Sequence, residues 1–172
     1  MRTRLVTLFL VVTVLVARPA LAGQQTDSAL ADRVAQIVRQ YVHFGIFDDI
    51  NIRVDHRSVT LTGRVTMPYK RDDIAARVKK IDGVRDLTNN VEILPVSQYD
   101  SDLRDRLARA IYGHPSFRHY ASMVNPPIHI VVEHGRVTLT GAVNSEVEKM
   151  LAFSLAQIPG VLGVTNELKT DR

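Results

Sequence analysis

The sequence predicts an α+β fold of two tandem αββαβ units, each a three-stranded mixed sheet with two helices packed on one face. The first reason is a repeat, because the pentapeptide VTLTG occurs at residues 59–63 and again at 137–141. The second is that each copy lies in a segment alternating between apolar and polar residues, which is typical of a half-buried strand. The third is that segments with apolar residues at helical spacing flank each pair of strands. A duplicated unit therefore sets the domain organisation.

The first unit shows each of these patterns once. Leu30, Val34 and Val38 recur at helical spacing, and only two residues, His56 and Arg57, separate two alternating segments. So short a connection permits only an antiparallel hairpin. The predicted elements are a helix at 28–43, strands at 50–55 and 58–65, a helix that opens at 66–68, and a strand at 87–93.

The second unit repeats this order with one insertion. Ten residues separate Phe117 from Ile128, whereas five separate Phe44 from Ile50. The extra residues predict an inserted loop at 118–127. The other predicted elements are a helix from 100–102 that ends before Pro115, a hairpin of 128–133 and 136–143 turning at His134-Gly135, a helix with a Ser145-x-x-Glu148 capping box, and a strand at 164–168.

Four glycines occupy repeated positions. Gly63 and Gly141 end the two VTLTG segments, where glycine in a strand indicates close packing by another backbone or a bend. Gly83 and Gly160 follow the second helix of each unit, the usual place of a glycine that ends a helix. We interpret all four as structural.

The chain begins with the features of a secretory signal peptide. A 13-residue apolar run, 5–17, follows two arginines and precedes Ala20-x-Ala22, so we expect cleavage before Gly23. The run is too short to span a bilayer, although an uncleaved membrane anchor is the competing interpretation. Removing residues 1–22 lowers the net charge from +4 to about +1, which argues against nucleic-acid binding through bulk charge. The chain has no cysteine, which excludes disulfides, thiolate chemistry and a lipid-modified cysteine.

The ends of the two units carry a family resemblance. Residues 81–84 read Ile-Asp-Gly-Val and 158–161 read Ile-Pro-Gly-Val, each followed by Thr-Asn-x-Val or Thr-Asn-x-Leu and preceded by VTLTG. These motifs resemble BON domains, with residues 27–95 as the first domain, 96–99 as a linker and 100–170 as the second. They specify the fold better than the ligand.

The resemblance also implies a function. An exported chain with two such domains is similar to osmotically inducible periplasmic proteins and to related outer-membrane-associated proteins of the cell envelope. The family is thought to contact phospholipid surfaces and is not known as an enzyme family. We therefore expect a non-enzymatic periplasmic protein that needs no cofactor, small-molecule substrate or nucleic acid, and that supports osmotic or envelope stress tolerance. The alternative is a protein-interaction adaptor in an envelope complex.

The differences between the copies indicate where a partner would bind. The last helix has an inward apolar stripe and adds three further apolar residues to it, so apolar groups cover more of its circumference than one buried face requires. The stripe is Val147, Leu151, Leu155 and Ile158, and the added residues are Met150, Ala152 and Phe153. The inserted loop mixes aromatic and cationic residues, a composition suited to a bilayer interface or a protein partner. Packing of one unit against the other is the structural alternative for both. The predicted contact residues are Phe117, Arg118, Tyr120, Met123, Met150 and Phe153.

The remaining candidates have simpler structural roles. His56 and His134 occupy equivalent turns, but two histidines are fewer than the three or more ligands of most metal sites. Asn89 and Asn166 share a strand face with apolar residues, which predicts that their amides satisfy backbone groups. The basic helix at 70–80 could meet anionic headgroups, yet its aspartates dilute the charge. No catalytic motif occurs, and we expect no metal site.

Overall fold

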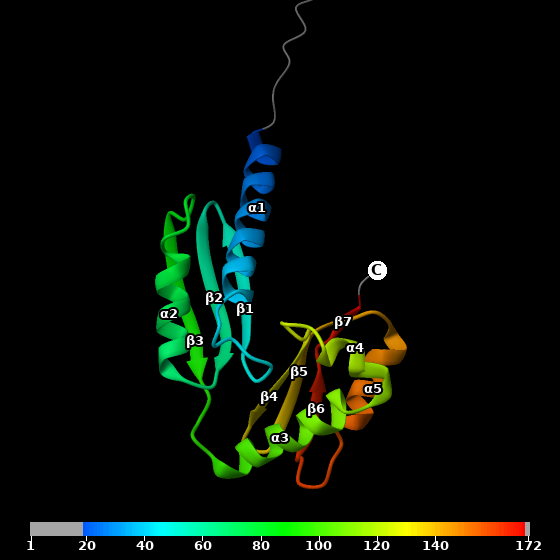
Figure 1. Cartoon of the computed structure of the whole chain (residues 1–172). Coiled ribbons are helices and arrows are strands. Elements are labelled where there is room, and N and C mark those ends of the chain that lie inside the picture. Colours follow the sequence, from blue (N-terminus) through cyan, green and yellow to red (C-terminus); the bar gives the residue numbers. More distant parts are fainter. Residues whose placement is uncertain (1–18, 171–172) are drawn as a thin grey trace, which may run out of the picture.

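A computed structural model describes residues 19–170 of the chain, with side chains from residue 26 onward. It contains two α+β units, one after the other along the sequence (Figure 1). This confirms the predicted fold class. The apolar run predicted to belong to the signal peptide, 5–17, lies outside the described residues. Within the described residues, no helix is long and apolar enough to cross a membrane.

The first unit has the predicted order of elements. Strand β2 lies at the centre of its sheet because it pairs antiparallel with β1 and parallel with β3. The parallel pair requires a crossover, which helix α2 supplies. The elements are α1 (Pro19–Arg39), β1 (Asp49–Asp55), β2 (Ser58–Val65), α2 (Pro68–Val78) and β3 (Asp86–Ile93).

The second unit repeats this topology, with β5 at the centre of its sheet. Its last strand is broken into β6 and β7, but both pair with β5 in one register, since Arg136 faces Gly163 and Ala142 faces Lys169. The elements are α3 (Gln98–Tyr112), the short 3-10 helix η1 (Pro115–Phe117), α4 (Arg118–Ala121), β4 (Ile128–Glu133), β5 (Arg136–Val143), α5 (Glu146–Leu155), β6 (Gly163–Asn166) and β7 (Lys169–Thr170).

Strand boundaries follow the sequence prediction more closely than helix boundaries do. Both hairpin turns are where the two-residue spacing predicted them, with positive φ at His56, Arg57, His134 and Gly135. By contrast, α1 begins at Pro19 rather than residue 28 and ends at Arg39 rather than residue 43. The inserted loop is also partly helical, because it contains α4. Helix ends depend on capping contacts that a periodic pattern does not specify.

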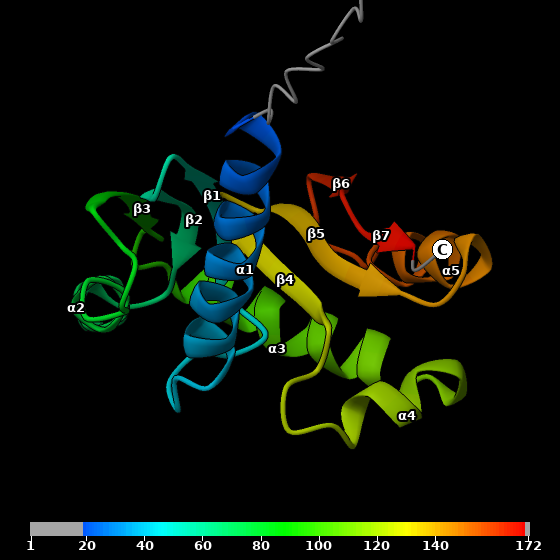
Figure 2. The same ribbon diagram turned by 90° about the horizontal axis from the view of Figure 1, so that it is seen from above.

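Each unit has its own hydrophobic core. The valine and the leucine of VTLTG are buried in both copies, together with apolar residues of the neighbouring helices. The cores also meet, because Phe47 of the first unit packs against the core of the second. Figure 2 shows the two units beside each other, the first with α1 and α2 and the second with α3 and α5. The two units therefore pack together, as small units of this size require.

Candidate functional site

Two of the predicted contact residues are buried in the second core. Phe117 is fully buried and Tyr120 is 3% exposed, and their rings stack with centroids 6.1 Å apart. The structure therefore corrects the prediction that these two rings form a surface for lipid or protein. The two rings instead cover one end of the second unit's core. Aromatic composition alone does not distinguish such a buried position from a surface one.

Tyr120 also takes part in a hydrogen-bond network at the place where the first unit has a different one. In the first unit, the buried carboxylate of Asp48 accepts hydrogen bonds from the backbone amide of Thr66 and from Lys70 Nζ. In the second, Glu148 accepts from Tyr120 Oη at 2.7 Å and from the backbone amide of Asn144 at 2.9 Å. A carboxylate thus holds the junction between the central strand and the next helix in both units. The capping box is met in part, since Ser145 Oγ accepts from the Glu148 amide while the Glu148 side chain binds Asn144.

We expect Phe117→Ala to lower the free energy of unfolding by about 3–5 kcal/mol, the usual cost of truncating a buried phenylalanine. Met123→Ala, at a 47% exposed position of the same segment, should change it by less than about 0.5 kcal/mol. Urea unfolding followed by circular dichroism measures both. Equal small effects would show that Phe117 is not a core residue.

The remaining predicted contact residues lie at the surface. Arg118 and Met123 are exposed on the inserted segment, Met150 is 62% exposed on α5, and Phe153 is half-buried beside it. Met150 is left uncovered, as its exposure shows, and Phe153 lines a shallow cavity whose lining residues all belong to the second unit. Domain packing therefore does not account for these two.

The structure adds two residues to this surface. Val147 was predicted to face the core, but it is 77% exposed, whereas Ala152 is fully buried and takes the inward position. Leu162, in the connection to β6, is exposed and lines the same cavity as Phe153. Val147 and Met150 are three residues apart and so lie on one side of the helix. We name Val147, Met150, Phe153 and Leu162 the α5 face.

The repeated glycines have the structural role predicted for them. All four have positive φ, between 95° and 115°. A Cβ at Gly63 would lie 2.3 Å from the carbonyl oxygen of Asp49, and one at Gly141 would lie 1.8 Å from that of Pro127. The prediction of a bend or of close packing by another backbone is confirmed on both counts, because φ is positive and a neighbouring carbonyl group is close.

The sequence analysis did not predict a second repeated feature, an aspartate that binds the hairpin turn of each unit. Asp27 of α1 accepts hydrogen bonds from the amides of His56 and Arg57, and Asp100 of α3 accepts from those of His134 and Gly135 at 2.9 and 2.8 Å. Each aspartate fixes one hairpin turn. Asp100 was interpreted as a residue of the helix N-terminus, but Ser97 is the N-cap. The pairing links residues far apart in sequence, so no local pattern reveals it.

A buried arginine lies near Asp100. Arg104 is 8% exposed and donates to the carbonyl oxygen of Val132 at 2.7 Å. Burial lowers its pKa, and the charges of Asp100 and Asp48 oppose that shift. The two carboxylates therefore offset part of the cost of burying the guanidinium.

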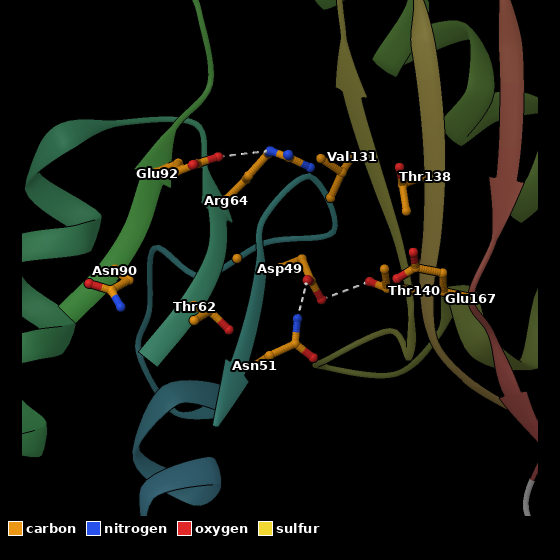
Figure 3. A pocket seen from close by; sticks show the side chains of 11 residues that line it. Asp49, Asn51, Thr62, Arg64, Asn90, Glu92, Val131, Thr138, Thr140 and Glu167 are labelled. Atoms are coloured by element: carbon orange, nitrogen blue, oxygen red, sulfur yellow. Dashed lines mark hydrogen bonds and ion pairs between the residues drawn. The ribbon is translucent and has the colours of Figure 1, made fainter. Parts of the chain in front are cut away.

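The two sheets enclose a polar cleft between the units, with a volume of about 420 Å³ (Figure 3). Asp49 of β1 bridges it, because its carboxylate accepts from Thr140 Oγ1 at 2.8 Å and also from Asn51. Arg64 lies 3.3 Å from both Glu92 of its own unit and Glu133 of the other. The threonine face of the two VTLTG strands, opposite their buried valine and leucine, thus contributes to the domain interface.

An apolar contact and a backbone contact complete the interface. The ring of Phe44 lies 5.2 Å from that of His129, and the amide of Ile130 donates to the carbonyl oxygen of Ile46 at 2.7 Å. The loop before β1 therefore packs along β4.

The histidines of the turns are exposed, and the inward asparagines bind backbone groups. Around His56 and His134, as elsewhere in the described residues, there is no group of three or more histidines or acids arranged to hold a metal. Asn166 Nδ2 donates to the carbonyl oxygen of Lys149 at 2.9 Å and its Oδ1 accepts from the amide of Leu168, and Asn89 does the same with Arg71 and Val91. The amides satisfy backbone groups, as predicted, although two of the partners belong to helices.

A comparison with protein families agrees with this architecture. The family model for the BON domain matches residues 26–95 and again 99–172. Comparison with curated proteins gave no match. Two solved structures of CdsD, a structural protein of the type III secretion system of Chlamydia trachomatis, one of them its C-terminal domain, are similar at 15% and 16% identity. The matches cover 85% of this chain and 67% or 65% of the other, with TM-scores of 0.34 and 0.32.

The family match covers most of the chain and gives each unit its own match. BON domains are associated with envelope and periplasmic proteins, and the family is not known as enzymatic. With the same topology and the same repeated aspartate, asparagine and glycine contacts in both units, the chain belongs to the BON domain family as a tandem pair of BON domains.

Proposed function

We propose that this protein is a non-enzymatic periplasmic protein that maintains the cell envelope by contacting anionic phospholipid surfaces through its second BON domain. Such contact would support osmotic or envelope stress tolerance. The observation that carries the proposal is the α5 face, whose Val147, Met150 and Leu162 are 77%, 62% and 69% exposed. Large apolar side chains gathered on one side of a helix and the adjoining turn are typical of an interaction surface.

Cationic residues flank this face. Arg136 lies next to the turn that carries Leu162, since its guanidinium is 3.4 Å from the Cβ position of Gly163. Lys149 is in the same helix, and its side chain is half-buried. A cation near an anionic leaflet contributes about 1 kcal/mol. Arg118 and Met123 of the inserted segment complete the proposed contacts.

The size of the face predicts weak, reversible association. Burying a large aliphatic side chain contributes about 1.5–3 kcal/mol, so three mostly exposed side chains give roughly 4–5 kcal/mol. That energy corresponds to a factor of about 10³ in partitioning, far below the effect of a spanning helix. The protein would therefore bind the membrane surface reversibly, without a permanent anchor.

Co-sedimentation with vesicles tests the proposal. We expect the purified protein to bind phosphatidylglycerol vesicles more than phosphatidylcholine vesicles. The double variant Val147→Asp/Met150→Asp should lose at least about tenfold in binding, because it places two charges in the contact. Met67→Asp changes an exposed methionine of the first domain and is the matched control.

Equal binding to both vesicle types, or equal binding by the double variant and the control, would exclude the proposal. A protein captured from periplasm by the wild type and lost only in the double variant, with no vesicle binding, would instead favour the adaptor function.

A further inference from the structure

A groove between the two domains has walls from the first-domain loop and from the inserted segment of the second domain. It has a volume of about 210 Å³ and is lined mainly by apolar groups. The two walls approach each other because the Phe44 and His129 rings are in contact where the loop meets β4. We name it the interdomain groove, and its principal lining residues are Arg39, Phe44, Ile46, Val124, Pro127 and His129.

The groove opens into a larger space. A neighbouring cavity of about 570 Å³ lies between α1 and strands β4 and β5, and it shares Arg39, Phe44, Pro127 and His129 with the groove. Ligand sites usually have about 300–1,000 Å³, so the groove alone takes part of a chain, whereas the two together take a whole small amphiphile. The lining of the larger cavity includes Val38, Ile50 and Ile52.

Arg39 supplies a cation at the junction of the two cavities. It is the last residue of α1, its side chain is exposed, and it lines both spaces. Among the described residues, its guanidinium forms no hydrogen bond or ion pair, whereas the nearby carboxylate of Asp49 is already bound by Thr140 and Asn51. An anionic group is therefore the natural complement of this position.

His129 gives the wall a second unusual feature. Its Nδ1 is buried and has no hydrogen-bond partner in the described part of the chain. Native proteins rarely leave such an atom unpaired, and exceptions often mark a site that is incomplete without another molecule.

The groove depends on the insertion. The inserted segment brings Val124 and Pro127 to the wall, and the first copy has only five residues at the corresponding place. From the apolar walls, the free guanidinium and the narrow shape, we propose that the interdomain groove binds one single-chain amphiphile, its acyl chain between the domains and its anionic headgroup, a carboxylate or a phosphate, at Arg39.

This site is separate from the α5 face, so it extends the proposed lipid contact to monomeric lipid. Isothermal titration with dodecanoate below its micelle-forming concentration tests it. We expect saturable binding at one molecule per protein. Arg39→Glu should weaken binding at least about tenfold, and so should Val124→Asp, which places a carboxylate in the groove.

Two matched controls and two other headgroups sharpen the test. Arg33→Glu lies on the same helix and Val96→Asp in the exposed linker, neither lining the groove, and both should bind like the wild type. Dodecyl phosphate should bind and dodecyltrimethylammonium should not; tighter binding of the phosphate would point to a phospholipid-derived ligand, and tighter binding of dodecanoate to a free fatty acid. Circular dichroism would verify that each variant is folded.

Absence of saturable binding, equal binding of the ammonium amphiphile, or equal affinity of Arg39→Glu and Arg33→Glu would overturn the proposal. The Val147→Asp/Met150→Asp variant should still bind dodecanoate. Failure of vesicle binding and failure of this site are therefore distinguishable.

Discussion

Gly141→Ala is expected to lower the free energy of unfolding by at least about 3 kcal/mol, or to prevent folding. An alanine Cβ would lie 1.8 Å from the carbonyl oxygen of Pro127, and φ at this position is 104°. The backbone conformation alone costs about 1–3 kcal/mol for a residue other than glycine, and the overlap with a rigid carbonyl adds to it. Chemical denaturation of the purified variant measures the change.

The chain contains a matched control for this substitution. A Cβ at Gly45 would have no atom closer than Asp48 Oδ2 at 3.8 Å, and Gly45 does not have positive φ. We expect Gly45→Ala to change stability by less than about 1 kcal/mol. If Gly141→Ala is as mild as Gly45→Ala, the approach of Pro127 does not exist in solution.

Asp100→Ala is expected to destabilise the protein by about 3 kcal/mol or more. The substitution leaves the amides of His134 and Gly135 without their acceptor, and it removes the charge that opposes the desolvation of Arg104. Hydrogen bonds to a charged group contribute about 1.5–3 kcal/mol each when buried, and an uncompensated buried cation adds a further cost. Thermal and urea unfolding report the loss.

Asp27→Ala provides the comparison within the same chain. Asp27 makes the equivalent two hydrogen bonds in the first domain, but they are exposed to solvent. Water can replace them, so we expect a loss of only about 1 kcal/mol. Similar losses at both positions would mean that burial of Asp100 contributes nothing.

The sequence predicted strands and turns well because their signals are local. The alternation at 58–65 and 136–143 places Val59, Leu61 and their counterparts on one face, and a two-residue connection fixes the hairpin. The parallel third strand followed from the helix between it and the hairpin. The tight approach at Gly63 and Gly141 was also predictable, because glycine weakens a strand and its recurrence at the same position indicates a backbone close by.

The candidate site was predictable only in part. Phe117 was expected at the surface because it lies beside an insertion, but the insertion folds back and buries it. Val147 was expected to be buried because its spacing fits an apolar stripe on α5. The helix has apolar residues on more than one side, however, and the structure turns the side with Ala152 inward. No pattern in the sequence indicated a binding role for Arg39. Its importance comes from a second domain whose placement no periodic pattern describes.

Phe47 has a consequence for how this tandem chain can be divided. A duplication first yields two equivalent modules that could be separated or exchanged in order. Phe47 belongs to the loop of the first module, yet it packs against the hydrophobic core of the second, and within the described residues no hydrophobic side chain of the second module packs against the core of the first. The dependence is therefore one-directional: the first domain can be cut away with its own core complete, whereas the second then loses part of its covering. Phe47 therefore ties the core of the second domain to the domain that precedes it in the chain.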